Sequence, residues 1–595
     1  MTDGDIFKRV THDVDLCVIG GGTAGIAAAV AAARHGSTVV LMHDRPVLGG
    51  NASSECRVHI CGADRHGRIN HKRETGLLEE LRMLNLYRNP TSNFFIHDTL
   101  LWELVAAEEN ITLLLNCTCQ DAATDGDRIA GVTGWQLAAE TIHEVRARWF
   151  ADCSGDGILA PLTGADFRVG REARDEYDES LAPETADDAT MGHSIRFQTA
   201  RYDTPQTFVP PPWAYTYESC DDLPGGADRH AGPKVGLGFW WIELGGEHDT
   251  ITDTPYLRDA LVKIAYGVWD HLKNRCPRCR AEAKYLNLEW IGALPAKRES
   301  RRYVGAHVLS QNDLESEGAF DDTIAYGGWS MDDHNPAGFY AAREGRPPTI
   351  FHSCPSPYGI PLRSLYSRNI ANLFFAGRDM SATHMAMSST RVMGTGMACG
   401  QAVGTAVGLM RTKDLDRPAQ VLDHITELQQ TLLWDDCFLP GMPLTVPALT
   451  RRATLTTSRG NAQPIRDGWS RQIDDDPHAW EQAGPGQWVQ YDFHEPVELS
   501  EVAIAFDTRL DVDVQMSWSM HCVGRYLTAP PDTLAQRFTV ECLVDGHWTP
   551  VIMETNNIHR YYRRRLDTRA EAIRLRLDRF WGNVDVARLY TFLVR

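Results

Sequence analysis

The sequence has little positive charge and lacks the features of secreted or membrane-inserted proteins. Its 59 lysines and arginines are outnumbered by 79 aspartates and glutamates, which gives a formal net charge of −20. Because an acidic surface repels phosphate backbones and anionic lipid headgroups, we expect neither nucleic acid nor a membrane surface as a partner. The N-terminal stretch MTDGDIFKRVTHDVD has no apolar core and no twin arginine, so we expect a cytoplasmic protein without a signal peptide.

The sequence also lacks a dense cysteine pattern. Its 14 cysteines are spread over 595 residues, which excludes a small disulfide-linked scaffold. One CxxC is present, Cys276-Pro277-Arg278-Cys279, and no second CxxC exists to complete a zinc site. We therefore expect no metal site, and cysteines at these positions that are unligated or on the surface.

One uncharged run imitates a membrane-spanning helix. Residues 392–410, VMGTGMACGQAVGTAVGLM, are flanked by Arg391 and Arg411 and have the length of a span. Glycines recur there every four residues, at 396, 400, 404 and 408, so they line one helix face. Such a face permits close backbone contact with another membrane helix or with a sheet and a cofactor. Few leucine, isoleucine or phenylalanine residues occur in the run, and its context favours a soluble protein.

Near the N-terminus the chain alternates between strand and helix. Residues 14–19 and 37–42 read as apolar strands, and the alanine-rich residues 23–34 between them read as a helix, an order typical of a parallel sheet. The turn between the first strand and this helix is Gly20-Gly21-Gly22-Thr23-Ala24-Gly25, which follows the dinucleotide-binding pattern GxGxxG. Gly20 allows the tight turn, Gly22 allows close approach of a pyrophosphate, and Gly25 allows the helix to pack on the strand. Asp44, at the end of the second strand, can accept hydrogen bonds from ribose hydroxyls.

Several further motifs carry a family resemblance. The fragments GGNASSECRVHICG, ADCSGDG, PAKRESRRYVG and NLFFAGRDMSATHMAMSSTRVMGTG occur in an order that resembles the bacterial FAD-dependent oxidoreductase family. This family is similar to the two-dinucleotide-binding flavoproteins of the fumarate reductase and glutathione reductase type. The resemblance covers roughly residues 13–415 and implies non-covalently bound FAD. Many relatives have glutamate where this chain has His43, so the ribose-binding role passes to Asp44, one residue later.

The resemblance and the composition together predict the domain organisation. We expect an α/β, Rossmann-like FAD-binding domain with an inserted cap, followed by an all-β jelly-roll sandwich. The sandwich resembles galactose-binding-like, discoidin-type domains through GQWVQYDFHEPVELSEVAIAFDT and IRLRLDRFWGNVDVARLYTF, where apolar and polar residues alternate. The predicted ranges are 1–165 and 361–436 for the FAD-binding domain, 166–360 for the cap or substrate domain, 437–450 for a linker and 451–595 for the sandwich.

The resemblance also implies the residues that surround the cofactor. Asp379, after the glycine turn at 377, is implied to hold a ribityl hydroxyl or a bridging water. The N-terminus of the glycine-lined helix is expected to point at the flavin and to stabilise negative charge on its reduced form. The implied cofactor-binding residues are Gly20, Gly22, Thr23, Ala24, Gly25, Asp44, Arg45, Gly49, Gly50, Asn51, Ser154, Gly155, Gly377, Arg378, Asp379, Thr395 and Gly396.

Four residues are candidates for catalysis. His384 and Arg391 lie between Asp379 and the cofactor helix, so we expect both near the isoalloxazine, with His384 as general base. The alternative is a buried histidine and an arginine that caps backbone carbonyls. His59 follows the GGN loop and can face the ring. His334 lies in GGWSMDDHNP, which we expect to be a loop suited to sugars, with a solvated turn as the alternative.

The sequence is compatible with three functions. The first is hydride transfer between flavin and a carbinol or ketone of a sugar, glycoside or related polyol. The second is reduction or dehydrogenation of a carbon–carbon bond in a carboxylate, with Arg298, Arg301 and Arg391 binding the carboxylate. The third is a non-catalytic, glycan-binding flavoprotein. The expected partners are a small molecule, most simply a carbohydrate, an electron acceptor that the sequence does not identify, and a second copy of the chain if it is a homo-oligomer.

Overall fold

A computed structural model describes residues 6–224, 242–344, 346–514, 516 and 526–595. The chain divides into two compact units. One contains residues 1–65, 94–425 and 516–523, and the other contains 66–93, 426–515 and 524–595. Helix α2 (Leu77–Arg88) therefore belongs with the C-terminal strands rather than with the N-terminal sheet.

A mostly parallel sheet forms the centre of the first unit. Its strands are β1 (Lys8–Ile19), β2 (Val39–Met42), β3 (Ile111–Leu114), β4 (Cys117–Asp125), β5 (Arg128–Gln136), β6 (Thr141–Asp152) and β17 (Leu373–Phe375). They are ordered β3-β2-β1-β6-β5-β4, and β17 also pairs with β6. Strand β6 pairs antiparallel with β5 along its first half and parallel with β17 at its end. The sheet confirms the predicted Rossmann-like α/β fold, and β1 begins earlier than expected because Lys8 already pairs with β6.

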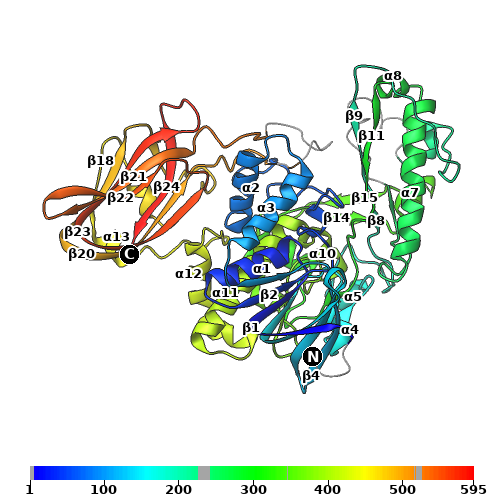
Figure 1. The fold of residues 1–595 in the computed structure, drawn as a ribbon, viewed down its shortest axis with the longest axis horizontal. Coiled ribbons are helices and arrows are strands. Elements are labelled where there is room, and N and C mark those ends of the chain that lie inside the picture. The colour runs from blue at the N-terminus through cyan, green and yellow to red at the C-terminus, as the bar shows by residue number, and fades with distance from the viewer. Residues whose placement is uncertain (1–5, 225–241, 345, 515, 517–525) are drawn as a thin grey trace. The chain divides into compact units, whose positions relative to one another are not determined.

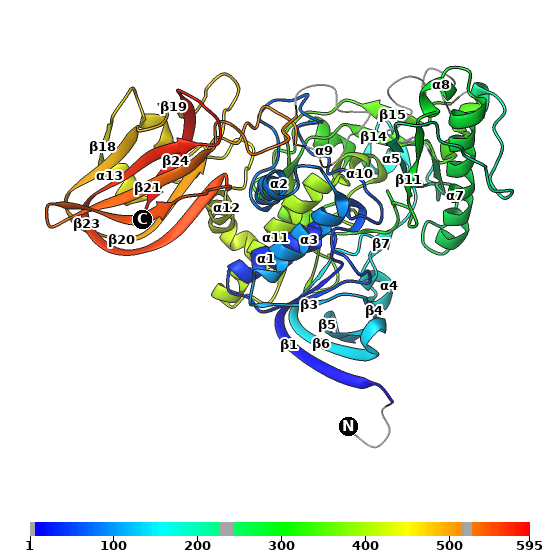
Figure 2. The same cartoon turned by 45° about the horizontal axis from the view of Figure 1, so that its top comes forward.

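Helices α1 (Thr23–Arg34) and α11 (Met393–Lys413) lie side by side next to this sheet (Figures 1 and 2). The glycine face of α11 makes the contact. An ideal Cβ on Gly400 would lie 2.0 Å from the Ala24 carbonyl oxygen, and one on Gly404 would lie 2.2 Å from the Ala28 carbonyl oxygen. Close backbone contact is thus confirmed, and the partner helix is α1. The glycine face serves packing inside the first unit.

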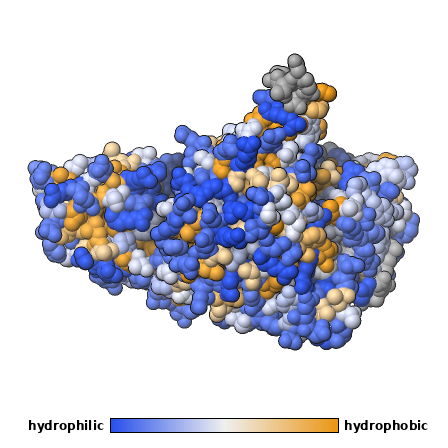
Figure 3. All heavy atoms as spheres, turned by 90° about the horizontal axis from the view of Figure 1, so that it is seen from below, coloured by the Kyte–Doolittle hydropathy of each residue, from blue (hydrophilic) through white to orange (hydrophobic). Residues whose placement is uncertain are grey.

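None of the described helices combines the length and apolarity that a membrane span requires. On the face drawn in Figure 3, hydrophilic residues cover most of the surface and apolar residues lie between them.

The segment between β6 and β17 forms small two-stranded sheets and short helices. Its elements are α4 (Leu159–Thr163), β7 (Phe167–Arg168), α5 (Arg174–Tyr177), β8 (His193–Ser194), β9 (Phe197–Arg201), β10 (Glu243–Leu244), α7 (Thr254–Asp270), α8 (Arg280–Ala283), β11 (Leu286–Ile291), β12 (Arg302–Tyr303), α9 (Gln311–Glu315), β13 (Thr323–Gly327), β14 (Met331–His334), β15 (Thr349–His352) and β16 (Tyr358–Pro361). The pairs are β8–β10, β9–β11, β7–β12, β13–β16 and β14–β15. Figure 1 shows α7 beside the β9–β11 pair, and Trp269 of α7 packs there in an apolar cluster with Phe197. After β17, helix α10 (His384–Thr390) precedes α11, while α3 (Phe94–Ala106) precedes β3.

The second unit is built on an antiparallel sheet. Its elements are α12 (Ile425–Trp434), α13 (Ala448–Arg452), β18 (Thr454–Thr457), β19 (Trp480–Ala483), β20 (Trp488–Phe506), β21 (Ala535–Val544), β22 (His547–Glu554), β23 (Tyr561–Phe580) and β24 (Ala587–Val594). The order is β19-β24-β20-β23-β21-β22, with β18 against β20. The predicted alternation is confirmed, because Val489, Tyr491 and Phe493 of β20 and Ile573 and Leu575 of β23 all enter one apolar core. Next to α2, the fully buried Arg73 and Glu79 form an ion pair of 2.7 Å.

Candidate functional site

The glycine turn after β1 leaves open space in front of helix α1. Gly20 has a φ of +102°, and an ideal Cβ on it would lie 2.3 Å from the Cys153 carbonyl oxygen, so only glycine fits. Gly22 is the N-cap of α1, and in the described part of the chain nothing lies within 4 Å of its ideal Cβ. An N-terminus with unpaired N–H groups and free space before it is suited to a pyrophosphate.

His43 holds this turn in place. Its Nδ1 accepts a hydrogen bond from the Gly21 N–H at 3.0 Å, and its Nε2 lies 3.1 Å from the Val47 carbonyl, to which it donates. Burial lowers the pKa of His43 to about 4, so the ring is neutral at pH 7. Asp44 is 61% exposed, with Oδ1 3.3 Å from His43 Nδ1. Its carboxylate is therefore accessible, as a ribose contact requires, while the neighbouring Arg45 approaches Glu55 at 3.6 Å.

Two further glycine segments meet the turn. Gly49 has a φ of +110° and donates its N–H to the Gly21 carbonyl at 2.8 Å. An ideal Cβ on Gly50 would lie 3.3 Å from the Gly22 Cα. On the other side, an ideal Cβ on Gly396 of α11 would lie 3.3 Å from the Gly377 Cα. Segments far apart in the sequence thus form one cradle that is lined by backbone.

Buried polar atoms at this cradle provide a test of the fit of FAD. Asp379 is fully buried; its Oδ2 accepts the Gly155 N–H at 3.2 Å, while its Oδ1 has no hydrogen-bond partner among the described residues. Burial, and then the charge of Asp152, raise the pKa of Asp379 well above its usual value. Thr395 Oγ1 and Arg378 Nη1 are likewise buried without partners in the described part. Because buried polar atoms are normally paired, these atoms fit a ligand rich in hydroxyl and phosphate oxygens.

Other predicted cofactor residues have protein contacts. Thr23 Oγ1 approaches the Met393 carbonyl at 3.4 Å, which links the N-termini of α1 and α11. Asn51 Nδ2 donates to the Lys297 carbonyl at 3.0 Å. Ser154 accepts the Ile158 N–H at its Oγ, 3.3 Å away. These residues border the cradle, and their contact with a cofactor stays a prediction.

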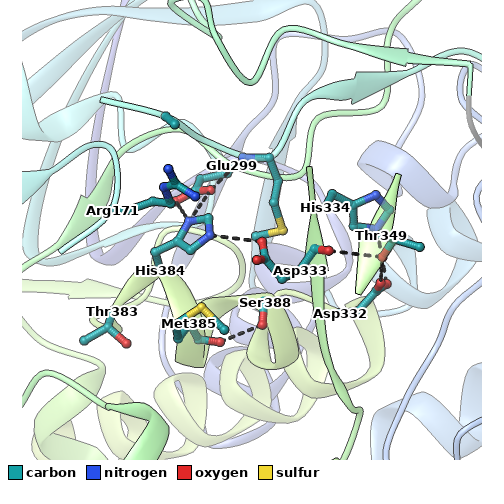
Figure 4. Close-up of polar contacts among 12 residues, drawn as sticks. Arg171, Glu299, Asp332, Asp333, His334, Thr349, Thr383, His384, Met385 and Ser388 are labelled. Atoms are coloured by element: carbon teal, nitrogen blue, oxygen red, sulfur yellow. Dashed lines mark hydrogen bonds and ion pairs between the residues drawn. The ribbon is translucent and has the colours of Figure 1, made fainter. Parts of the chain in front are cut away.

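A buried charged cluster surrounds His384 at the start of α10 (Figure 4). Its Nδ1 lies 2.9 Å from a Glu299 carboxylate oxygen, and its Nε2 lies 3.2 Å from Asp333 Oδ1. Burial alone would lower the pKa of His384, but the charge of Glu299 and hydrogen bonds to Asp333 and Glu299 outweigh it and raise the pKa to about 10. At neutral pH this side chain is therefore an imidazolium. In this form it is a cation that can give up a proton, and its predicted role as general base stays a prediction.

A second histidine of the same cluster lies on β14. His334 Nδ1 is 2.8 Å from Glu243, and its Nε2 is 3.2 Å from Asp332. Burial lowers the pKa of His334, but Glu243 and Asp332 raise it above the usual value. Arg391 donates to the Asp332 carboxylate at 3.2 Å. Arg391 also donates to the Asp332 backbone carbonyl at 3.1 Å, a contact of the kind that the alternative for this residue describes.

The segment around His334 is not the loop that the sequence suggested. Residues Met331–His334 form β14, and its register with β15 pairs Asp332 with Phe351 and His334 with Thr349. Asp332 and His334 are both buried, which also excludes a solvated turn. The glycine-rich start of the segment misled the prediction, because strand pairing between distant residues overrides local turn propensity.

The segment PAKRESRR takes part in this network of buried ion pairs. Fully buried Arg302 pairs with Glu172 at 2.7 Å and also contacts Glu299. The His384 backbone N–H donates to Glu172 at 2.8 Å. Glu172 and Glu243 were missed by the sequence analysis, because each stands alone in an irregular region without a motif. His59 is buried on the segment after the Gly49–Gly50 loop, and its role stays a prediction.

The chain matches one protein-family model and is similar to several solved structures. A family model described as "FAD dependent oxidoreductase" matches residues 15–432. No curated protein matches the chain. Among solved structures, a geranylgeranyl bacteriochlorophyll reductase-like protein from Thermoplasma acidophilum is 12% identical, with a TM-score of 0.32, and the match covers 72% of this chain and 86% of that one.

Two similar solved structures correspond to a smaller part of the chain. A family 32 carbohydrate-binding module from EndoD of Streptococcus pneumoniae is 12% identical, with a TM-score of 0.20, over 25% of this chain and 97% of that one. A family 32 module of NanJ from C. perfringens, solved with galactose, is 13% identical, with a TM-score of 0.18, over 24% of this chain and 95% of that one.

Proposed function

Because the chain belongs to the FAD-dependent oxidoreductase family, we propose that it transfers a hydride between flavin and a carbinol or ketone carbon of a sugar, glycoside or related polyol. FAD, when bound, supplies or accepts the hydride at its flavin N5. The single observation that carries the proposal is the position of His384 between the carboxylates of Glu299 and Asp333, a few residues after the Gly377–Asp379 turn. Interconversion of a carbinol and a ketone needs a positioned group of this kind to exchange the oxygen-bound proton.

The residues of the cradle would hold FAD in the following way. The Gly20–Gly25 turn and the N-terminus of α1 bind the pyrophosphate, and the exposed Asp44 carboxylate binds the ribose. Asp379 Oδ1 would accept a hydrogen bond from a hydroxyl group of the cofactor, and Thr395 Oγ1 would donate one to a carbonyl group. The N-terminus of α11 would stabilise negative charge on the reduced flavin.

The His384–Asp333 pair would hold and move the proton. Glu299 is fully buried, so it fixes the ring through Nδ1 and cannot itself reach a substrate. The Asp333 side chain is 22% exposed, so the Nε2 side of His384 is the end of the network nearest to solvent. In the direction of ketone reduction, Nε2 would release its proton through Asp333, the exposed member of the pair, to the oxygen as the carbon receives hydride. In carbinol oxidation, the same nitrogen must first be deprotonated, which its pKa of about 10 disfavours at neutral pH.

A panel of substrates under anaerobic conditions tests this function. Oxidised holoenzyme is mixed with neutral sugars, glycosides and polyols, and the flavin absorbance is followed. In parallel, dithionite-reduced holoenzyme is mixed with the matching keto-sugars, and reoxidation is followed. Flavin turnover with a neutral carbinol–ketone pair is expected. Turnover confined to carboxylates that gain or lose a carbon–carbon double bond would contradict the proposal.

A second candidate function rests on the arginines of the same cluster. Arg391 Nε is buried without a hydrogen-bond partner in the described residues. Burial lowers the pKa of Arg298, the charge of Glu243 opposes this shift, and the charge of Arg391 lowers the pKa further. Two close guanidinium groups favour an anionic ligand, as a carboxylate substrate with a reducible carbon–carbon bond would provide. In that case neutral compounds should leave the flavin absorbance unchanged, and Arg391→Lys should raise KM for carboxylates by about tenfold or more.

A further inference from the structure

Three side chains with metal-binding atoms converge at the end of helix α7. The helix continues into a five-residue π-helical turn, η5 (His271–Arg275), and Cys276 follows it. Cys220 opens a short 3-10 helix, η3 (Cys220–Asp222), on a different segment. The ligand atoms of Cys220, His271 and Cys276 all lie within 4.8 Å of one another. None of these residues belongs to the cofactor cradle or to the cluster around His384.

The distances match the edges of a tetrahedron around zinc. Cys220 Sγ lies 3.7 Å from Cys276 Sγ and 3.5 Å from His271 Nε2. Zinc–sulfur bonds of about 2.3 Å and zinc–nitrogen bonds of about 2.05 Å give tetrahedral edges of about 3.8 Å between sulfurs and about 3.6 Å between sulfur and nitrogen. A disulfide needs an S–S distance of about 2.05 Å, and all of these cysteines are thiols. The spacing therefore suits a shared ion rather than a covalent link.

The orientation of the His271 ring supports the same conclusion. Its Nδ1 lies 2.9 Å from the Tyr217 backbone carbonyl. A carbonyl only accepts, so Nδ1 carries the proton and Nε2 presents its lone pair toward Cys220. Metal-binding histidines are commonly fixed through their second nitrogen in this way. The Cys276 N–H donates to the His271 carbonyl at 2.7 Å, and this π turn brings the two residues together.

Cys279 is a further thiol beside these three side chains. It is fully buried, and it follows Cys276 in the CxxC sequence. A side-chain hydrogen bond joins its thiol to Cys276, so the two sulfurs are neighbours. Its sulfur does not belong to the set whose ligand atoms all lie within 4.8 Å of one another. Helix α8 begins directly after it. With Cys279 turned onto the ion, three thiolates and one imidazole would complete a four-coordinate set with no position left for substrate.

We propose that Cys220, His271, Cys276 and Cys279 bind one zinc ion in a closed, structural site. The ion ties the η3 segment to the end of α7 and to the start of α8, inside an apolar cluster that includes Tyr217, Trp269 and Leu272. It reinforces the inserted region between β6 and β17 and takes no part in flavin chemistry.

Metal content of the purified full-length holoenzyme tests the proposal. We expect one zinc per chain by elemental mass spectrometry, and less than about a tenth of that in Cys220→Ser and Cys276→Ser. Cys437→Ser, which replaces another partly buried cysteine, is the matched control and should keep the ion. Absence of zinc from wild-type protein produced with zinc present would overturn the proposal. Zinc that stays stoichiometric in both cluster variants would also overturn it.

A measurement on wild-type protein keeps the test decisive if the variants do not fold. X-ray absorption at the zinc edge should find three sulfurs at about 2.3 Å and one nitrogen at about 2.05 Å. A shell of nitrogen and oxygen alone would contradict the assignment. So would a disulfide between any two of the three cysteines, found by mass spectrometry of protein purified without reductant.

Discussion

The cofactor cradle and the cluster around His384 lie in the same unit but are built from different material. The cradle consists of backbone, where glycines at 20, 22, 49, 50 and 377 let three turns and two helix ends approach one another. The cluster consists of ionised side chains taken from separated segments and buried against each other. A backbone cradle offers fixed N–H groups and space, while a buried charge cluster offers a proton whose pKa depends on its neighbours.

Two buried histidines illustrate this difference. His43 in the cradle contacts a backbone N–H and a carbonyl, and burial lowers its pKa to about 4. His384 contacts two carboxylates, which outweigh burial and raise its pKa to about 10. The same side chain is thus a neutral structural support in one region and a cation in the other. Burial alone does not decide the charge of a histidine; its partners do.

The largest effect is expected at Gly22 of the cradle. Gly22→Val should abolish FAD binding, because the valine side chain would occupy the open space in front of α1. The absorbance ratio of flavin to protein measures this, and circular dichroism should show an intact fold, since no described atom clashes with a Cβ there. Gly25→Ala is the contrast: its Cβ would lie 1.8 Å from the Gly20 carbonyl oxygen, so it should damage the fold itself. Stoichiometric FAD in Gly22→Val would refute the assignment of the cradle.

The next largest effect is expected at His384. His384→Gln should keep FAD bound but slow flavin reduction by substrate about 10²–10⁴-fold, the usual loss when a positioned acid or base is removed. Stopped-flow absorbance under anaerobic conditions gives the rate. His97→Gln, at a buried histidine of α3 whose pKa burial lowers to about 4, is the control and should reduce at the wild-type rate. A normal rate in His384→Gln would pass the role to His334 or His59, and loss of FAD would make His384 structural.

The pH dependence of the same reaction sharpens the comparison. Oxidation of a carbinol needs deprotonated His384, so the rate should rise about tenfold per pH unit and level off near pH 10. Ketone reduction needs the protonated form and should fall above that pH. The His384→Gln variant should lose both dependences. A midpoint near 6.5 in the wild type would show that Glu299 and Asp333 do not control the ring.

The smallest effect is on stability, and its sign is opposite for the two histidines. The pKa of His43 is lower in the folded state, so the unfolded chain binds more protons and stability is lost as pH falls from about 6.5 to about 4, by about 3 kcal/mol. The pKa of His384 is higher in the folded state, so its contribution is present below pH 6.5 and is lost as pH rises toward 10. Melting temperatures across pH should show a weaker acid dependence in His43→Gln and a weaker alkaline dependence in His384→Gln than in the wild type. Parallel profiles for the two variants would contradict this.

The cradle could be predicted from the sequence because its parts are local. A glycine that must adopt positive φ, or that lets another backbone segment approach closely, can be recognised from a single sequence position, as Gly20 and Gly377 can. Helix α1 was predicted to the residue for the same reason. The partners of His384 could not be predicted, because Glu172, Glu299 and Asp333 meet only through the fold. The candidate metal ligands show the same limit: CxxC gave Cys276 and Cys279, but Cys220 and His271 complete the set through a π turn that no sequence pattern indicates.

Strand β6 has a consequence for how the chain is made. It pairs with β1 early in the sequence and with β17 more than two hundred residues later, where Phe150 faces Leu373. On the ribosome the N-terminal strands emerge first, and the last parallel strand arrives only after the whole inserted region has been synthesised. The edge of β6 opposite β1 therefore has no partner at its carboxyl end while the insertion folds. Lengthening the insertion would add little to the entropic cost of closing this loop, because that cost grows only with the logarithm of loop length. New substrate regions could therefore be inserted there without a change in the sheet.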